Sequence, residues 1–596
     1  MKKKRKGSGF VAVHYLDSRR LIPHRKQLSL ISSCDALSET RTMSKREAVQ
    51  SSSSPGITRK QVKRYDNKQL PNCYLHIMRN CVYTLTLLLW FTLCESHFAA
   101  ENSREHREPP IYASYTTSNK NVNFTHVITD KVTGRVFIGA SNWIYQFSGD
   151  LKLEHAFQSG PVEDSPNCSP SDCSSVDPTN IKPTNNVNKV LVIDAESRML
   201  ITCGSVHQGS CRRHKLDDIR QVEPLIPLPV SANDENSSTV AFVGPARYFD
   251  NAVQSVLYVA VTNSRLGPYR AEAPAISSRS LESGSRLFSV VEKSFTDTAR
   301  VDISYHLRDY YLVKYVYGFH SGEFVYFATV QRKSPLRALE EWGYVTRLAR
   351  VCDSDAGFHS YAEITIQCIS PDGTDLNILQ DAVVVKVGSN LADKLRVEKG
   401  SHVLIGVFAA SKDHTTRLFA SSGICVYPLS HIESKFMENI LMCYNGSVLT
   451  RNMDYIAGSV NDCPVPGRTK TAPNFCNESL KLNGSLPLIT NAVITYPNTT
   501  LTSITATTTG QHTVAFVGTS EGALKKIIIA SERQAEEFEE VIVDKGFPIL
   551  PDIVLDNSHK FVFVASPYKV AKIKLERCFK YYNCSQCLGA NNPYCG

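Results

Sequence analysis

The segment Gly518-Thr519-Ser520-Glu521-Gly522 matches the G-x-S-x-G pattern that positions the nucleophilic serine of many hydrolases. That chemistry requires a strand, a sharp turn and then a helix. Here the surrounding sequence, AFVGTSEGALKKIIIA, predicts a strand, a tight turn and a second strand. The chain also lacks the HExxH, P-loop and dinucleotide-binding patterns. We therefore expect no catalytic residue, no cofactor and no enzyme activity.

Cysteine is the second residue type that could do chemistry. Cys203 and Cys211 flank a short glycine-containing turn, and His207 and His214 are close in sequence. This spacing suits one disulfide across a hairpin, and it also resembles part of a Cys/His metal site. We favour the disulfide because the chain carries export signals, and we expect no metal.

The other cysteines lie in three groups. Cys168 and Cys173 share a Ser/Asp/Pro-rich loop and predict a local bridge. Near the end of the chain, Cys584 and Cys587 imitate a redox or zinc motif, but four cysteines within 578–596 favour structural bridges in an oxidising compartment. The third group allows 15 pairings and comprises Cys352, Cys368, Cys425, Cys443, Cys463 and Cys476.

Export is predicted by an apolar run that follows Met78. A short basic start and the run Cys81–Cys94 form a secretory signal peptide, which we place at 78–100, rather than a full membrane span. Residues 1–77 form a predicted disordered upstream extension absent from the mature protein. Asn-x-Ser/Thr acceptors for glycosylation follow the run, at Asn123, Asn236, Asn445, Asn477, Asn483 and Asn498.

The net charge of +9 comes from this upstream part. Residues 1–77 hold 17 Lys/Arg and 5 Asp/Glu, whereas the remaining chain holds 49 and 52 and is close to neutral. The basic MKKKRK start resembles a nuclear-import signal, but a solvated disordered segment explains it as well. We expect no nucleic-acid partner.

Seven similar units follow one another between about 111 and 575. Each contains β-branched and aromatic strands separated by Gly, Asn, Asp and Ser turns. Stacking such units radially buries a continuous core and protects strand edges, which predicts an all-β, seven-bladed β-propeller. Sandwich domains in series are the alternative. The units are centred on 126–147, 189–206, 255–261, 324–351, 403–427, 513–529 and 552–575.

Two segments depart from the strand pattern. SERQAEEFEEVIV (531–543) predicts one short helix between strands. Residues 577–596 predict a small disulfide-dependent domain, because so short a segment cannot build its own core.

A candidate partner-binding segment lies beside turn residues at Arg247, Tyr248 and Phe249. Tyr and Arg are favoured anchors in protein interfaces, and propeller loops carry function on a rigid base. The alternative is that both aromatics belong to a strand and pack inside.

Four motifs in this order resemble the plexins, a family of semaphorin receptors: CGSVHQGSC (203–211), GFHSGEFVYFATVQ (318–331), RVCDSDAGFHSYAEITIQC (350–368) and CFKYYNCSQCLGANNPYCG (578–596). The resemblance covers roughly 111–596. It implies a sema propeller over 101–576 and a truncated PSI domain over 577–596. It also implies the pairs Cys168–Cys173, Cys203–Cys211, Cys352–Cys476, Cys368–Cys425, Cys443–Cys463 and Cys578–Cys595, with Cys584 and Cys587 pairing beyond Gly596.

For function, the resemblance implies the extracellular, ligand-binding region of a transmembrane plexin that binds semaphorins in cell and axon guidance. It implies a place on the outer side of the cell membrane, with anchoring only through a span outside this sequence, and allows a receptor homodimer or co-receptor. Two alternatives are the sema head of a hepatocyte-growth-factor-type receptor kinase and a secreted semaphorin. The first would carry a basic cleavage site near 290–320, and no basic cluster is present there.

Overall fold

The computed structural model describes residues 109–119, 121–249, 252–465, 475–581 and 583–595. The expected upstream extension (1–77) and signal peptide (78–100) lie outside the described residues.

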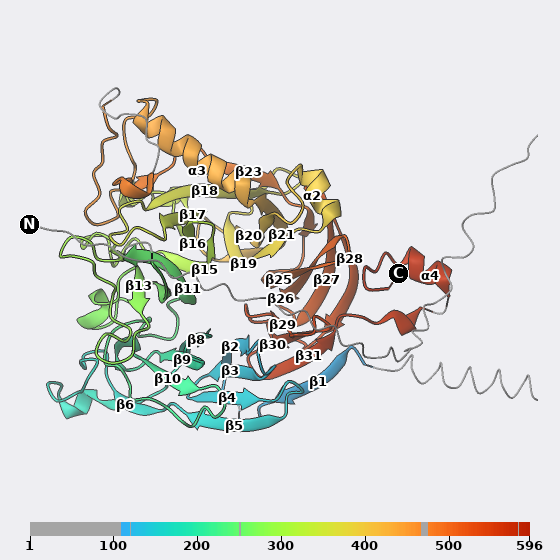
Figure 1. The fold of residues 1–596 in the computed structure, drawn as a ribbon, viewed down its shortest axis with the longest axis horizontal. Coiled ribbons are helices and arrows are strands. Elements are labelled where there is room, and N and C mark those ends of the chain that lie inside the picture. Colours follow the sequence, from blue (N-terminus) through green and yellow to red (C-terminus); the bar gives the residue numbers. More distant parts are fainter. Residues whose placement is uncertain (1–108, 120, 250–251, 466–474, 582, 596) are drawn as a thin grey trace, which may run out of the picture. The chain divides into compact units, whose positions relative to one another are not determined.

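Seven antiparallel sheets follow one another around a ring, as the sequence predicts (Figure 1). Numbered along the chain, blade 1 contains β2 (Phe124–Thr129), β3 (Val136–Ala140), β4 (Trp143–Phe147) and β5 (Leu153–Gln158); blade 2 contains β8 (Asn188–Asp194), β9 (Met199–Gly204) and β10 (Cys211–Lys215); blade 3 contains β11 (Thr239–Phe249), β12 (Ala252–Val261), β13 (Ile276–Ser280) and β14 (Arg300–Val301); blade 4 contains β15 (Lys314–Ser321), β16 (Phe324–Arg332), β17 (Tyr344–Cys352) and β18 (Ala362–Ile369).

The later blades have the same organisation. Blade 5 contains β19 (Ile378–Lys386), β20 (His402–Ser411), β21 (Leu418–Pro428) and β24 (Ile494–Tyr496); blade 6 contains β25 (Leu501–Thr509), β26 (His512–Thr519), β27 (Ala523–Ser531) and β28 (Gln534–Ile542); blade 7 contains β29 (Val554–Leu555), β30 (Phe561–Ala565), β31 (Lys569–Lys574) and β1 (Ile111–Thr116). A separate two-stranded ribbon is formed by β6 (Val162–Asp164) and β7 (Lys182–Thr184).

The two ends of the propeller meet in blade 7. Strand β1 pairs antiparallel with β31, so that Tyr115 lies opposite Val570. The first strand of the propeller thus completes its last sheet. The backbone hydrogen bonds of blade 7 join the two ends of the ring, and no strand edge is left open between them.

Between the blades lie the hydrophobic cores. Seven buried apolar clusters each join two neighbouring blades, one for every junction around the ring. Between blades 3 and 4, for example, the Phe242 ring lies 5.4 Å from the Tyr258 ring and 5.9 Å from the Phe327 ring. Because each core needs residues from two blades, no blade buries its apolar side chains alone.

A long insertion separates β21 from β24 of blade 5. It contains α3 (Leu429–Tyr444), and its strands β22 (Leu482–Asn483) and β23 (Leu488–Asn491) extend blade 4 by parallel pairing with β18. Helix α3 was not predicted from the sequence, although its buried positions Leu429, Ile432, Phe436, Ile440 and Cys443 have helical spacing.

The short helix predicted at 531–543 is wrong, because Gln534–Ile542 is strand β28 at the outer edge of blade 6. Its glutamates pair with lysines of the neighbouring strand: Lys525 Nζ lies 2.5 Å from Glu540 Oε2, and Lys526 Nζ lies 2.7 Å from Glu539 Oε2. Pairing across strands therefore outweighs the helix propensity of a glutamate-rich segment.

The other helices in the described residues are short. They are α2 (Ser389–Leu395), α4 (Cys584–Gly589) and the 3₁₀ turns η1 (Pro178–Asn180), η2 (His207–Gly209), η3 (Tyr269–Ala271), η4 (Arg337–Trp342), η5 (Phe475–Asn477) and η6 (Cys578–Lys580). Within the described ranges, no helix combines the length and apolar character required to cross a bilayer.

Candidate ligand-binding surface

The predicted partner-binding segment forms the end of β11 in blade 3. Because side chains alternate along a strand, Tyr248 points inward, is 1% exposed, and its hydroxyl lies 2.6 Å from Ser278 Oγ. Tyr248 is therefore a core residue and cannot contact a partner, which corrects that part of the expectation. Arg247 is one-third exposed, and Phe249 is 40% exposed at the surface.

Arg247 connects blade 3 to blade 4. Its backbone N–H donates to the carbonyl oxygen of Asp353 (2.8 Å), and its Nη1 donates to Asp353 Oδ2 (2.5 Å). His320 Nε2 lies 2.9 Å from the same oxygen. Since Asp353 is 1% exposed and is shared by these two side chains, this cluster stabilises the junction between the blades.

An open groove of about 880 Å³ lies beside Phe249. Phe249 and Val253 form an apolar edge, and the exposed side chains of Glu196, Glu272 and Glu292 also line the groove. Exposed Arg286 and Arg300 line it as well, so the surface around the predicted segment is a depression with charged walls of both signs and an apolar edge.

A second exposed surface lies between blades 3 and 4. Arg332 lies 4.7 Å and Arg337 4.6 Å from the centroid of the Tyr310 ring, so that two guanidinium groups contact one aromatic side chain. Arg332 also pairs with Glu340 at 2.7 Å. These contacts join the loop after β14 to the β16–β17 loop.

The same two loops expose large apolar side chains. Tyr305 is 87% exposed, Leu336 61% and Trp342 53%. Trp, Tyr and Arg are the residue types that contribute most to protein interfaces. We call Tyr305, Tyr310, Arg332, Leu336, Arg337 and Trp342 the arginine–tryptophan platform.

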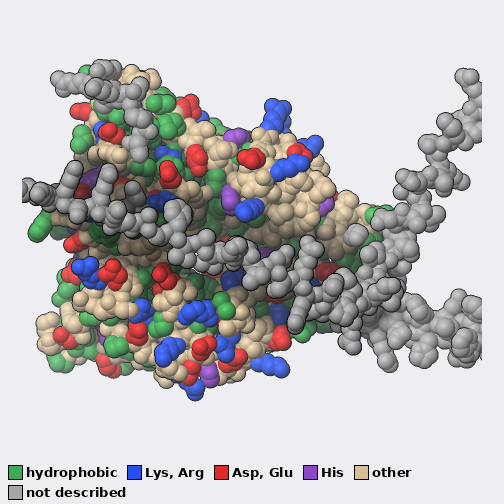
Figure 2. Space-filling model, in the orientation of Figure 1, with side chains coloured by type: hydrophobic (Ala, Val, Ile, Leu, Met, Phe, Trp, Pro, Cys, Tyr) green, Lys and Arg blue, Asp and Glu red, His purple; other side chains and the backbone are tan. Residues whose placement is uncertain are grey.

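This platform was not predicted from the sequence. The available signal was one Trp and two Leu in the otherwise mostly polar segment KSPLRALEEWG, between two apolar strands. Elsewhere, charged side chains of both signs are intermixed over the visible face of the molecule (Figure 2). This mixture agrees with the near-neutral charge of the chain after residue 77.

The structure contains six disulfides, at the same pairs that the plexin resemblance implies: Cys168–Cys173, Cys203–Cys211, Cys352–Cys476, Cys368–Cys425, Cys443–Cys463 and Cys578–Cys595. Cys587 forms no disulfide within the described residues. His214 is buried, with Nδ1 2.7 Å from the Ile219 carbonyl oxygen and Nε2 3.0 Å from Thr202 Oγ1.

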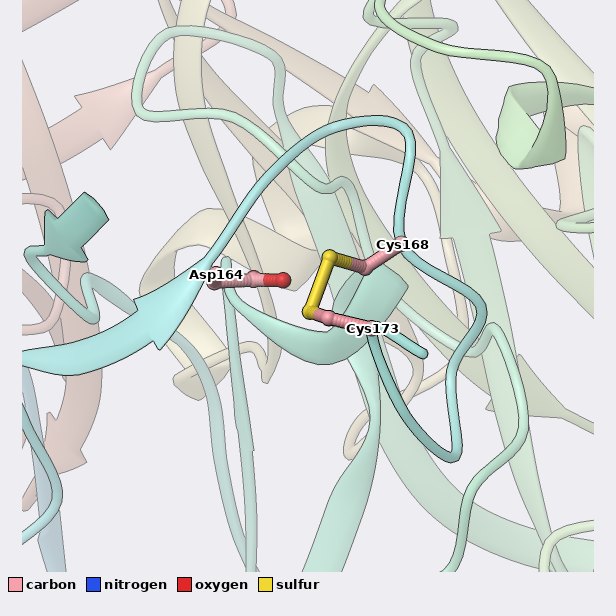
Figure 3. A group of neighbouring side chains, drawn as sticks. All are labelled: Asp164, Cys168 and Cys173. Carbon is pink, nitrogen blue, oxygen red and sulfur yellow. A yellow bond between two sulfur atoms is a disulfide. The ribbon is translucent and has the colours of Figure 1, made fainter. Parts of the chain in front are cut away.

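Asp164, Cys168 and Cys173 lie close enough together to suggest a metal site (Figure 3). Both sulfur atoms are joined in the disulfide, so neither is available as a thiolate ligand. Asp164 accepts backbone N–H groups from Ser165 and His207, both at 2.8 Å. This group therefore fixes loop geometry.

Ser520 lies in the tight turn between β26 and β27, and its Oγ donates to Glu521 Oε1 at 2.6 Å. The G-x-S-x-G match is thus part of a β-hairpin, as the sequence predicts, and not a strand–helix elbow.

Of the predicted glycosylation acceptors, four are exposed and two are half-buried. The exposed residues are Asn236, Asn445, Asn477 and Asn498, and the half-buried ones are Asn123 and Asn483.

Comparison with known proteins identifies the fold and the family. The Sema domain family model matches residues 379–556. Mouse Plexin-A4 is 32% identical over 492 residues, which cover 79% of this chain and 25% of that protein, and mouse Plexin-A2 is 30% identical over 513 residues, covering 82% and 26%. The chain thus spans about a quarter of the length of these relatives.

Solved structures agree with the relationship to plexins. The full extracellular region of Plexin A4, in the structure that holds its domains 1 to 8, superposes with a TM-score of 0.73 and 28% identity, covering 81% of this chain and 49% of that one. Drosophila Semaphorin 2a, with a TM-score of 0.55 and 13% identity over 82% of this chain and 79% of its own, shares the fold. The chain belongs to the plexin family, and its propeller is a sema domain.

Proposed function

We propose that this chain is the ligand-binding part of a plexin receptor's extracellular region and that it binds semaphorins in guidance signalling. The observation that carries the proposal is the identity of about 30% to plexins over most of the chain, together with the matching extracellular fold. A structure sharing this fold, with a TM-score of 0.52 and 14% identity over 81% of this chain and 90% of that chain, is described as Drosophila Plexin A in complex with Semaphorin 1b.

The proposal includes the domain organisation. A signal peptide at 78–100 directs the chain to the outer side of the cell membrane, the sema domain covers 101–576, and a PSI domain begins at 577. The density of cysteines after residue 577 and the disulfides of the propeller support an oxidising, extracellular environment. Exposed Asn236, Asn445, Asn477 and Asn498 are proposed to carry glycans.

The region acts by binding and not by catalysis, because its relatives are receptor extracellular regions and its Ser520 lies in a hairpin turn. The receptor-kinase and secreted-semaphorin alternatives are not favoured, since the curated relatives that match over most of the chain are plexins.

We assign semaphorin contact to the arginine–tryptophan platform. Removing a central Trp from an interface costs at least about 2 kcal/mol, so Trp342→Ala should weaken semaphorin binding about thirtyfold. Leu336→Asp should have a similar effect, because it places an unpaired charge in the interface.

The test measures binding of the secreted chain to a panel of semaphorin ectodomains by surface plasmon resonance. Leu153→Asp is the matched control, since Leu153 is 46% exposed on the outer strand of blade 1. Failure of the wild-type chain to bind any semaphorin would contradict the proposed function. Unchanged binding by both platform variants would contradict only the assignment of the surface.

A further inference from the structure

Where the chain leaves the propeller, one carboxylate contacts three cationic side chains. Glu539 of β28 accepts from Lys526 Nζ (2.7 Å) and from Arg577 Nη1 (2.7 Å), and Lys580 Nζ lies 3.6 Å from its Oε1. Lys526 belongs to β27 of blade 6, whereas Arg577 and Lys580 follow β31 and belong to the C-terminal cysteine-rich segment. We call these four residues the junction cluster.

The junction cluster is largely shielded from water. The side-chain exposure is 0% for Lys526, 6% for Glu539, 18% for Arg577 and 29% for Lys580. Three positive charges and one negative charge leave a net charge of +2. Buried charges are normally paired, because the loss of hydration is compensated only by a partner of opposite sign.

The hydrogen bonds show where the positive excess lies. Lys526 also donates to the backbone carbonyl oxygens of Lys574 (2.7 Å) and Leu575 (3.2 Å), so its ammonium group is well satisfied. Arg577 Nε, in contrast, is buried and has no hydrogen-bond partner among the described residues. Lys580 is the most exposed of the four, and its ammonium lies 3.6 Å from Glu539, beyond hydrogen-bonding distance, so unused donor capacity remains at the buried Arg577 Nε and at the partly exposed Lys580.

The electrostatics agree with this geometry. Burial would raise the pKa of the Glu539 carboxyl, but the surrounding cations hold it below its usual value. Burial lowers the pKa of the Lys526 ammonium, and the charges of Arg577 and Lys580 add to this effect, although Glu539 opposes it. One carboxylate thus does not neutralise the cluster.

We propose that the junction cluster binds one small oxyanion from solution, of the sulfate or phosphate class, through Arg577 and Lys580. A guanidinium and an ammonium group presented together suit such an anion, and Lys526 with Glu539 fixes Arg577 in position. Because the cluster joins blade 6 to the C-terminal segment, the bound anion stabilises the attachment of that segment to the propeller.

The experiment titrates sodium sulfate into the intact chain at constant ionic strength, set with sodium chloride, and follows the melting temperature and the binding heat. We expect a saturable rise in melting temperature and a measurable dissociation constant. Lys580→Gln should weaken sulfate binding at least about tenfold, because it removes a hydrogen bond between charged groups. Lys545→Gln makes the same charge change at an exposed lysine after β28 and should leave the affinity unchanged.

A further variant separates anion binding from a purely structural role. Glu539→Gln raises the charge of the cluster from +2 to +3, so it should lower stability and yet bind sulfate more tightly. A merely structural cluster predicts the loss of stability without any change in the sulfate response. The proposal is overturned if the wild-type response does not saturate, as in general salt stabilisation, or if Lys580→Gln responds like the wild type.

Discussion

The hydroxyl group of Tyr455 should be worth several kcal/mol to the stability of the propeller, although it lies in the insertion of blade 5 and in no strand. It donates to Glu363 Oε2 at 2.7 Å and accepts from Arg347 Nη1 at 3.0 Å. Glu363 and Arg347, both of blade 4, have side chains that are 1% and 5% exposed. Burial, and then the charge of Glu363, raise the pKa of Tyr455 well above its usual value, so the hydroxyl stays protonated and donates.

The magnitude follows from these two bonds. Tyr455→Phe keeps the ring and creates no large cavity, but it removes two hydrogen bonds to charged groups, each worth about 1.5–3 kcal/mol. Glu363 keeps its bonds from Tyr361 (2.6 Å) and Gln331 (2.7 Å), so the carboxylate remains partly satisfied. We therefore expect a loss of about 2–4 kcal/mol, below the combined value of two fully buried charged hydrogen bonds.

Urea unfolding, followed by circular dichroism, measures this loss as a lower midpoint at an unchanged slope. The matched control is Tyr305→Phe, which makes the same chemical change at a side chain that is 87% exposed and should alter stability by less than about 0.5 kcal/mol. A Tyr455→Phe variant as neutral as this control would refute the reasoning, since the buried network would then not hold the insertion to blade 4.

Three further predictions concern other parts of the molecule. Burial lowers the pKa of His214 to about 4, below its unfolded value of 6.5. The free energy of unfolding should therefore fall by about 3 kcal/mol as the pH drops from 6.5 to 4. In His214→Gln, the urea midpoint measured at each pH should fall less over this range. The Cys352–Cys476 bridge joins residues 124 apart. The double variant Cys352→Ala/Cys476→Ala should lose about 2–5 kcal/mol of unfolding free energy in the same assay. A smaller loss would argue against a role of the bridge in holding the insertion. The wild-type chain should not hydrolyse p-nitrophenyl acetate above background, and any hydrolysis that Ser520→Ala abolishes would restore the hydrolase hypothesis.

The architecture could be predicted because strand patterns are local. Segments such as DIVLDNSHKFVFVASPYKVAKIKL show apolar runs and turn residues within a few positions, and they form β29, β30 and β31. The disulfide pairs are different: spacing leaves 15 arrangements for the six cysteines from Cys352 to Cys476, and only the family resemblance selects one.

Two local expectations differ from the structure. The segment that forms β28 has the composition of a helix, but it pairs along most of its length with β27, whose lysines contact its glutamates. Tyr248 is expected at a partner surface from its residue type, although its position between Arg247 and Phe249 in a strand puts it on the opposite face. Pairing with β27 decides the first case, and the alternation of side chains along β11 decides the second.

The arginine–tryptophan platform illustrates the same limit for function. Tyr310 contacts Arg332 and Arg337 only because the segment before β15 and the β16–β17 loop meet at one junction between blades. The core between blades 3 and 4 fixes that junction, and the pairing of β1 with β31 closes the ring that contains it. A loop held in this way can expose Leu336 and Trp342 without collapsing onto its own blade. Which side chains these two loops expose together depends on how the loops meet, so the proposed binding surface could be recognised only in the assembled propeller.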